Sequence, residues 1–203
     1  MSIPTWIRIT LATLLALDST ASASPAFREG DIVFSSSKRG QGEAIIAATG
    51  SAYTHCGIVF QKDGRLMVLE AVQPVGIVSL EEFRSRGTPG TFLARRLKLP
   101  LAPEKYQSAR AWAQAQVGKN YDPRFMWDDE NLYCSELVWK IYQHAGIELC
   151  APRRFRDYDL AKPAVRKIIE ERFGGMAKVP LDEKVVAPSD LASSPLLAEV
   201  TSP

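Results

Sequence analysis

The chain has 203 residues, of which 46% are hydrophobic, and its 25 basic and 23 acidic residues leave a formal net charge of +2. This length and hydrophobic content are sufficient for one globular domain with a full core. A charge balance this small gives no argument for a nucleic-acid-binding protein, and we expect no nucleic-acid partner.

The first residues read as a targeting segment. Arg8 precedes an apolar run over residues 9–17, and Ala21, Ser22 and Ala23 supply the small residues of a cleavage site. This pattern is typical of a secretory signal peptide cut after Ala23. The run is far short of the ~20 residues that a membrane span needs, although an uncleaved anchor is the alternative. We therefore predict a signal peptide over 1–23, a single domain with a C-terminal helical extension and tail over 24–203, and a periplasmic or secreted location without a stable membrane span after cleavage.

The first half of the remaining chain is rich in strand signals. Predicted elements are a strand at 31–34, a short helix at 43–48 stopped by Gly50, and two β-rich runs at 53–60 and 66–72. The Asp63-Gly64 pair between those two runs is a strong signal for a two-residue hairpin turn.

Loop length in this hairpin decides whether His55 and Glu70 meet. A two-residue turn pairs His55 with Val72 and makes Glu70 the diagonal neighbour of His55 on the same face. A four-residue loop over 61–64 would pair His55 with Glu70 directly, whereas a three-residue loop would put them on opposite faces. Either even-length loop thus places the carboxylate beside the imidazole.

The second half of the chain alternates short strands with helices. In order, the predicted elements are a strand at 76–78, a helix that begins at the capping box 79–82 and ends at Gly87, a strand at 91–97, a helix from Pro103 to Gly118, an irregular loop at 119–130, a helix at about 131–145, a helix at about 163–173, and a Pro- and Ser-rich tail.

The helix at 131–145 carries a thiol in its first turn. Asn131 is a good N-cap residue and Gly146 a good stop, which places Cys134 near N3 on the apolar stripe of the helix. Unpaired backbone N–H groups and the positive end of the helix dipole there lower the pKa of a thiol. The alternative is a small apolar core cysteine, which is the commoner fate of a lone Cys on a helix.

Together these residues supply the parts of a thiol hydrolase, which needs a nucleophile, a base, a group that orients the base, and oxyanion donors. Cys134 is the candidate nucleophile, His55 the base and Glu70 the orienting carboxylate, and the backbone N–H of Cys134 is one oxyanion donor. His144 lies about 10 residues along the same helix from the thiol, roughly 15 Å, and is too distant to be the base.

Three cysteines in a secreted chain leave at least one thiol unpaired within the monomer. Cys56 and Cys150 either pair with each other or remain two buried free thiols. No Cys or His has the spacing of a zinc motif, so we expect no metal site and no cofactor.

Five ordered motifs resemble the YiiX-like proteins, which belong to the circularly permuted branch of the NlpC-type papain-like cysteine peptidases and amidases. The motifs lie at residues 30–34, 53–57, 69–72, 118–122 and 133–139. The resemblance runs from about residue 29 to the tail. It implies an α+β, papain-like fold in which a central antiparallel β-sheet or barrel packs against the helix that carries the Cys nucleophile.

The same resemblance implies a cysteine amidase or peptidase that forms an acyl-enzyme, with a peptide from the cell wall as the leading substrate. It also suggests that the hydroxyl of Tyr121 completes the oxyanion hole. The chain has Tyr-Cys-Ser-Glu where the wider family usually has Asp-Cys-Ser-Gly, so Glu136 becomes a candidate for substrate contact. Tyr53, in the motif that contains His55, is a second candidate.

Two other functions stay open on the sequence. One is an acyltransferase or thioesterase that uses the same Cys134 on lipids, and the other is an envelope binding module without turnover. A long apolar channel beside Cys134 would favour acyl chains, whereas convergent charges would favour peptides. The expected partners are accordingly a peptide or acyl small molecule, including peptidoglycan fragments.

Overall fold

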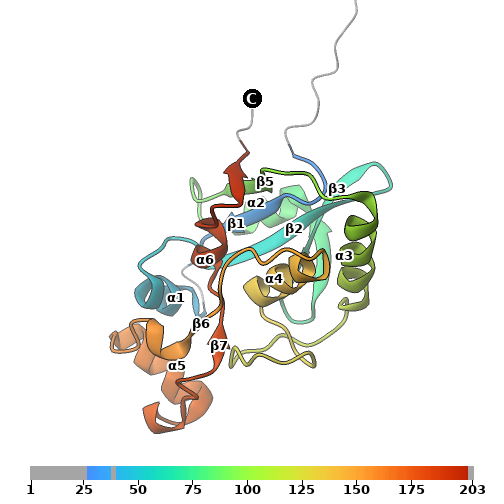
Figure 1. The fold of residues 1–203 in the computed structure, drawn as a ribbon. Helices are drawn as coiled ribbons and strands as arrows, with labels where there is room; N and C mark the ends of the chain where they lie inside the picture. Colours follow the sequence, from blue (N-terminus) through green and yellow to red (C-terminus); the bar gives the residue numbers. More distant parts are fainter. Residues whose placement is uncertain (1–26, 38–39, 201–203) are drawn as a thin grey trace, which may run out of the picture.

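The central feature of the structure, a computed structural model that describes residues 27–37 and 40–200, is a six-stranded antiparallel sheet. Its strand order is β4-β3-β2-β1-β5-β8, and Figure 1 labels β1, β2, β3 and β5 within it. The strands are β1 Ile32–Ser35, β2 His55–Lys62, β3 Arg65–Glu70, β4 Gly76–Ser79, β5 Leu93–Leu97 and β8 Leu197–Glu199. With the helices around it, this sheet confirms the predicted α+β class. The predicted signal peptide lies outside the described residues.

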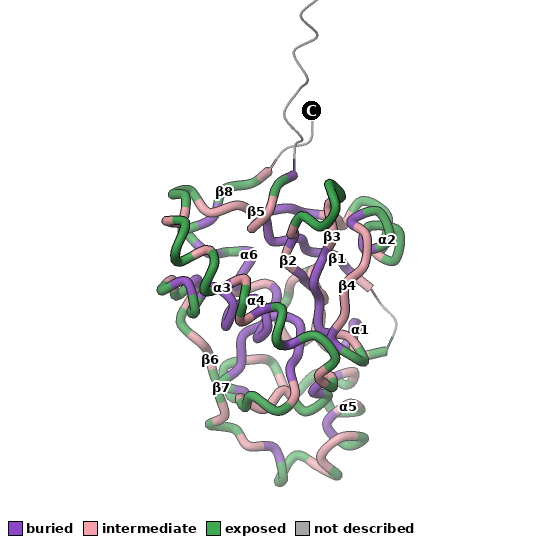
Figure 2. The backbone as a smooth tube through the Cα atoms, turned by 90° about the vertical axis from the view of Figure 1, so that its right-hand side faces the viewer, coloured by how far each residue is buried: buried purple, intermediate pink, exposed green. Residues whose placement is uncertain are grey.

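Helices cover both faces of the sheet. α3 and α4 pack together on one face and α2 lies on the other, as Figure 1 shows. The helices are α1 Gly42–Thr49, α2 Leu80–Arg86, α3 Pro103–Ala115, α4 Cys134–His144, α5 Pro163–Phe173 and α6 Pro188–Ala192. Nearly every residue of α4 is buried, and the burial colours of Figure 2 place α4 and the middle strands in the interior. The helix that carries the thiol is therefore a core element whose position is fixed on all sides.

The β2–β3 hairpin has the two-residue turn that the sequence predicts. Asp63 and Gly64 both have positive φ, 51° and 73°, as a type I′ turn requires. Lys62 pairs with Arg65, and the register continues to Ile58 opposite Leu69. Glu70 is thereby placed on the same face as His55, at the end of the hairpin away from the turn.

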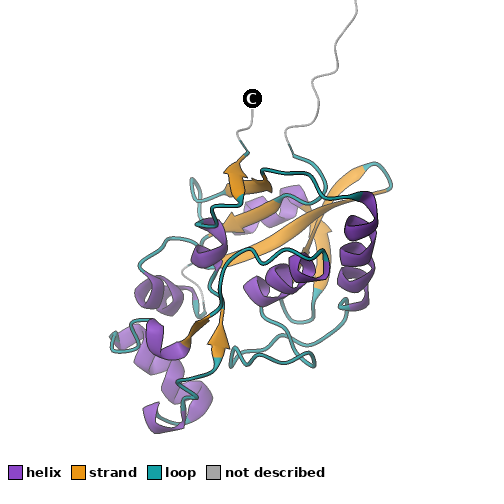
Figure 3. Ribbon diagram, in the orientation of Figure 1, coloured by secondary structure: helices purple, strands orange, loops and turns teal. Residues whose placement is uncertain are grey.

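A second group of elements lies beside the sheet and consists mainly of helices (Figure 3). α1 packs against α5, and a two-stranded sheet of β6 (Arg153–Arg154) and β7 (Lys184–Val185) joins them. The short 3-10 helices Phe155–Asp157 and Met176–Lys178 connect these elements. This group borders the start of α4, so it can form the wall of a site there.

The C-terminal residues differ from the predicted tail. They form β7, α6 and β8, and β8 pairs with β5 at the edge of the central sheet. Strand β8 has only three residues and is held by tertiary pairing, which explains why local sequence signals did not reveal it. Among the residues that the structure describes, no helix is long and apolar enough to span a membrane.

Candidate active site

The nucleophile candidate occupies the first position of α4. The helix begins at Cys134 with Tyr133 as its N-cap, so the predicted start at Asn131 and the predicted N3 position of the thiol are wrong. The side chain of Asp128 accepts hydrogen bonds from the N–H groups of Glu130 and Asn131 and keeps those residues in a loop. At the first position, the N–H of Cys134 has no partner within the helix and is available to a ligand.

His55 and Glu70 contact each other as the hairpin register predicts. The His55 Nε2 and Glu70 Oε2 atoms are 2.6 Å apart, and the Glu70 side chain is completely buried. The other carboxylate oxygen of Glu70 accepts a hydrogen bond from the Arg86 guanidinium at the end of α2. Because Nε2 faces Glu70, Nδ1 is the imidazole nitrogen left to interact with Cys134.

Gly57 makes room for this contact. It lies two residues beyond His55 on the same face of β2, with the Glu70 Cβ only 3.3 Å from the place where a Cβ on Gly57 would stand. That Cβ would also come within 2.5 Å of the Val68 side chain and within 2.8 Å of the Leu69 carbonyl oxygen, distances that real Cβ atoms do not show. A residue without a side chain is therefore required at position 57, where β2 passes close to Val68, Leu69 and Glu70 of β3.

The surroundings of His55 favour its charged form. Burial by itself lowers the pKa of the imidazole, but hydrogen bonds to Cys134 and Glu70 and the negative charges of both outweigh burial and raise this pKa from 6.5 to about 9. Burial raises the pKa of the Glu70 carboxyl, yet the hydrogen bonds and charges of His55 and Arg86 hold it below its usual value. Glu70 is therefore ionised at neutral pH and stabilises an imidazolium.

The Cys134 thiol is correspondingly acidic. A hydrogen bond from the Cys56 side chain has the largest effect on the pKa of Cys134 and lowers it. Burial raises this pKa, whereas the hydrogen bond and the charge of His55 lower it further, so the pKa of Cys134 lies well below its usual value. Burial raises the pKa of Cys56, which stays protonated and can donate. At neutral pH the site thus holds a thiolate beside an imidazolium, the reactive form of a Cys–His pair.

Tyr121 reaches the site from the loop between α3 and α4. Leu132, two residues before Cys134, forms a parallel bridge with Tyr121 that brings the two ends of the loop together. Burial, together with the negative charge of Cys134, raises the pKa of the Tyr121 hydroxyl, so it remains a hydrogen-bond donor. Its oxygen accepts a hydrogen bond from the side-chain amide of Gln41, the residue before α1.

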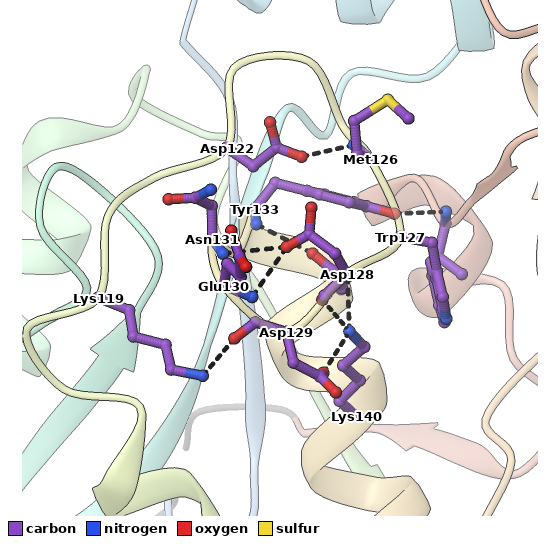
Figure 4. A network of polar contacts seen from close by, with 12 residues as sticks. Lys119, Asp122, Met126, Trp127, Asp128, Asp129, Glu130, Asn131, Tyr133 and Lys140 are labelled. Carbon is purple, nitrogen blue, oxygen red and sulfur yellow. Dashed lines mark hydrogen bonds and ion pairs between the residues drawn. The ribbon is translucent and has the colours of Figure 1, made fainter.

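Partly buried polar contacts hold the loop that carries Tyr121 against α4 (Figure 4). The Lys140 ammonium, only 7% exposed, donates to the carbonyl oxygen of Asp128 and to the carboxylate of Asp129. Asp122 accepts hydrogen bonds from the N–H groups of Arg124 and Met126. These contacts fix the loop, and with it the Tyr121 hydroxyl, relative to the helix that carries Cys134.

Glu136 serves this network and does not line the cavity beside the thiol. Its side chain has no exposed surface, accepts a hydrogen bond from the Tyr133 N–H at 3.3 Å, and lies 2.8 Å from the Lys140 ammonium. Burial raises the pKa of Glu136 to about 8. The contacts of Glu136 thus stabilise the start of α4. Its buried position differs from the substrate contact that the sequence suggested. Tyr53 packs against Phe34, and its contact with substrate stays a prediction.

An apolar cavity of about 100 Å³ opens beside Cys134. Its walls come from the start of α4, from α1 and α5, and from the β7–α6 segment. Residues on these walls include Gln41, Ile45, Phe125, Ile169, Arg172 and Val186. The cavity is smaller than the ~150 Å³ engineered cavity that takes up benzene in another protein, so it suits an apolar group of a few carbon atoms.

Comparison with known proteins identifies the relatives of this chain. Residues 26–201 match the family described as "Permuted papain-like amidase enzyme, YaeF/YiiX, C92 family". The chain belongs to this family. Membership confirms the predicted papain-like fold and indicates a hydrolase of the papain-like class.

Two members of the family are similar to this chain over most of its length. It is 36% identical over 181 residues to the uncharacterized protein YiiX of Escherichia coli strain K12, covering 87% of this chain and 89% of YiiX. A crystal structure described as that of the metalloprotein yiiX from Escherichia coli O157:H7 superposes with a TM-score of 0.80 at 36% identity, covering 87% of this chain and 97% of the other.

Three residues near the thiol were not assigned to the site from the sequence. Gln41, Cys56 and Arg86 each contact a predicted site residue through a long-range side-chain interaction, for which sequence spacing gives no signal. All three cysteines are free thiols in the structure, so Cys56 and Cys150 do not pair; Cys56 is buried as expected, whereas Cys150 is only half-buried. His144 stacks on Trp112 at 4.6 Å between ring centroids, at the far end of α4.

Proposed function

We propose that the protein is a cysteine amidase that hydrolyses an amide bond through Cys134, His55 and Glu70. The observation that carries this proposal is the position of the Cys134 thiol at the start of α4, hydrogen-bonded to an imidazole whose other nitrogen lies 2.6 Å from a buried carboxylate. This arrangement supplies a nucleophile, a proton carrier and an orienting charge at neutral pH.

The reaction runs in two steps. The Cys134 thiolate attacks the amide carbonyl carbon, and the oxyanion that forms accepts hydrogen bonds from the Cys134 N–H and the Tyr121 hydroxyl. The C–N bond then breaks as the imidazolium of His55 gives its proton to the departing amine, which leaves a thioester on Cys134. In the second step His55 takes a proton from water, the hydroxide attacks the thioester, and the carboxylic acid and the thiolate are released.

The cavity supports a substrate with a small apolar group beside the scissile carbonyl. The leading substrates are cell-wall peptides, which carry such groups as alanine side chains, and the accompanying location is the periplasm or the exterior after cleavage of residues 1–23. An acyltransferase or thioesterase acting on lipids is the second candidate, because the cavity walls are apolar. The amidase stands first because the matching family is described as a permuted papain-like amidase.

The related yiiX crystal structure is described as a metalloprotein, but the described residues of this chain do not fit a metal site. Among residues 27–37 and 40–200, no group of three or more His, Cys, Asp or Glu side chains is arranged to hold an ion. The proposed steps accordingly use protein side chains and backbone N–H groups.

Replacing Cys134 tests the proposal. Wild-type protein and the Cys134→Ala variant are incubated with cell-wall peptides and with acyl esters, and products and covalent adducts are identified by mass spectrometry. Cys150→Ala, which removes a thiol outside the site, is the matched control. We expect turnover and a peptidyl adduct in the wild type and in Cys150→Ala, and neither in Cys134→Ala. Hydrolysis that survives in Cys134→Ala would contradict the mechanism, and a fatty-acyl adduct would favour the second candidate.

A further inference from the structure

One buried polar atom next to the thiol has no use in the mechanism above. Gln41 donates from Nε2 to the Tyr121 hydroxyl oxygen, but its Oε1 atom is buried and has no hydrogen-bond partner among the described residues. Gln41 lines the same cavity as Cys134. Native proteins pair nearly all of their buried polar atoms, so an unpaired carbonyl oxygen at this place points to a donor that the substrate brings.

The Tyr121 proton supports this orientation of the Gln41 amide. A tyrosine hydroxyl has a single proton, and it cannot serve both Gln41 and the oxyanion. With Nε2 of Gln41 toward Tyr121, the hydroxyl oxygen accepts and its proton is free to turn toward Cys134, whose negative charge attracts it. If the Gln41 amide were rotated by a half turn, its Oε1 atom would accept the Tyr121 proton. That proton would then not be available to the oxyanion.

Tyr121 and Gln41 therefore present a donor and an acceptor side by side. An amino-acid residue in extended conformation carries the complementary pair, because its own N–H and C=O groups point toward the same edge of the chain. If the C=O of such a residue faces the Tyr121 hydroxyl, its N–H faces Gln41 Oε1. The N–H of the scissile amide itself cannot serve, because in a trans amide it points away from the carbonyl oxygen.

We propose that Gln41 and Tyr121 together recognise the N–H and C=O of one extended residue, which makes the protein selective for amides of N-acylated amino acids, that is for peptides, over plain acyl chains. This inference rests on the proposed amidase function and names its substrate class. A fatty acyl group has no N–H beside its carbonyl and leaves Gln41 Oε1 unpaired in a buried site. The cavity beside Cys134 takes the side chain of the same residue.

A matched pair of chromogenic compounds tests the inference. N-acetyl-alanine p-nitroanilide and its analogue with an ester oxygen in place of the alanine N–H share the same scissile bond and the same side chain. The Gln41→Met variant keeps the length of the side chain and removes both of its polar atoms. The matched control is Gln107→Met, at an exposed position in α3.

In the wild type and in Gln107→Met we expect kcat/KM to be about tenfold higher for the compound with the N–H, the factor that one neutral hydrogen bond supplies. Gln41→Met should remove this preference by lowering kcat/KM for that compound. Gln41→Glu retains an acceptor oxygen and should keep the preference even if both rates fall. Equal losses on the two compounds in Gln41→Met, or no loss, would overturn the inference, because Gln41 would then act only on Tyr121 or on the oxyanion.

A binding measurement separates this inference from the proposed function. In the Cys134→Ala background the compounds stay intact, and calorimetry compares their dissociation constants with and without Gln41→Met. Tighter binding of the N–H compound that disappears in the double variant supports the inference even if the wild type hydrolyses neither compound. Equal binding of the two compounds, or no binding of either, would overturn it whatever the turnover results.

Discussion

The carboxylate of Glu70 offers the sharpest perturbation of the site. Glu70→Gln keeps the size of the side chain and removes the negative charge that faces His55 at 2.6 Å. The rise in the His55 pKa from 6.5 to about 9 corresponds to about 3 kcal/mol in favour of the imidazolium, and Glu70 shares this effect with Cys134. If Glu70 contributes about half, its loss lowers the equilibrium constant for forming the thiolate–imidazolium pair by about tenfold or somewhat more.

Loss of orientation adds to this electrostatic effect, so we expect Glu70→Gln to lower kcat/KM roughly 10- to 100-fold. The sign of the pH effect follows from the same interaction. Activity needs the imidazolium, which is lost as the pH rises through the pKa of His55, so the alkaline limb of the profile should lie near pH 9 in the wild type and move toward 6.5 in the variant.

The assay is kcat/KM from pH 5 to pH 10 with the p-nitroanilide of N-acetyl-alanine. Glu81→Gln, at an exposed position on α2, is the matched control and should leave the profile unchanged. A Glu70→Gln protein with wild-type kcat/KM and an alkaline limb still near pH 9 would refute the role of Glu70.

Three further changes probe the supports of the site. Gly57→Ala should lower the free energy of unfolding by about 1–3 kcal/mol, measured by urea titration, because the new Cβ collides with Val68; a neutral result would contradict the close approach. Glu136→Ala should destabilise the fold by a similar ~1–3 kcal/mol. Glu136→Gln should destabilise it less, because Gln still accepts a hydrogen bond from the Tyr133 N–H. A raised KM at unchanged stability would instead indicate that Glu136 contacts the substrate. Cys56→Ala should move the pH at which Cys134 becomes reactive toward higher values, whereas Cys56→Ser, which keeps a donor, should do so less. An unchanged Cys134 profile in Cys56→Ala would show that the Cys56 thiol does not stabilise the thiolate.

The hairpin shows what local sequence signals can establish. Asp63-Gly64 fits a type I′ turn, that turn fixes the register, and the register places Glu70 on the face of His55. The contact between His55 and Glu70 was therefore predictable from a turn type and residue parity. The same holds for helix α2, whose Ser79 side chain accepts from the Glu82 N–H as its capping box predicts.

The start of α4 shows where local signals fail. Asn131 is a good N-cap residue by type, but the Asp128 side chain accepts hydrogen bonds from the N–H groups of Glu130 and Asn131. The bridge between Leu132 and Tyr121 also keeps the chain extended up to the start of the helix. These contacts cross from one end of a loop to the other and have no counterpart in a helix pattern. The Gln41 and Arg86 contacts are of the same kind, because they depend on how α1 and α2 pack against the sheet.

The rate at which iodoacetamide alkylates Cys134, followed against pH, reports whether the neighbours of Cys134 hold it as a thiolate. Wild-type protein is compared with His55→Ala, and the modified residue is identified by mass spectrometry. We predict that Cys134 is already fully reactive at neutral pH in the wild type and that its reactivity moves to higher pH in His55→Ala. A wild-type Cys134 that reacts only near or above about pH 8.5, as an ordinary thiol does, would show that its neighbours do not lower its pKa.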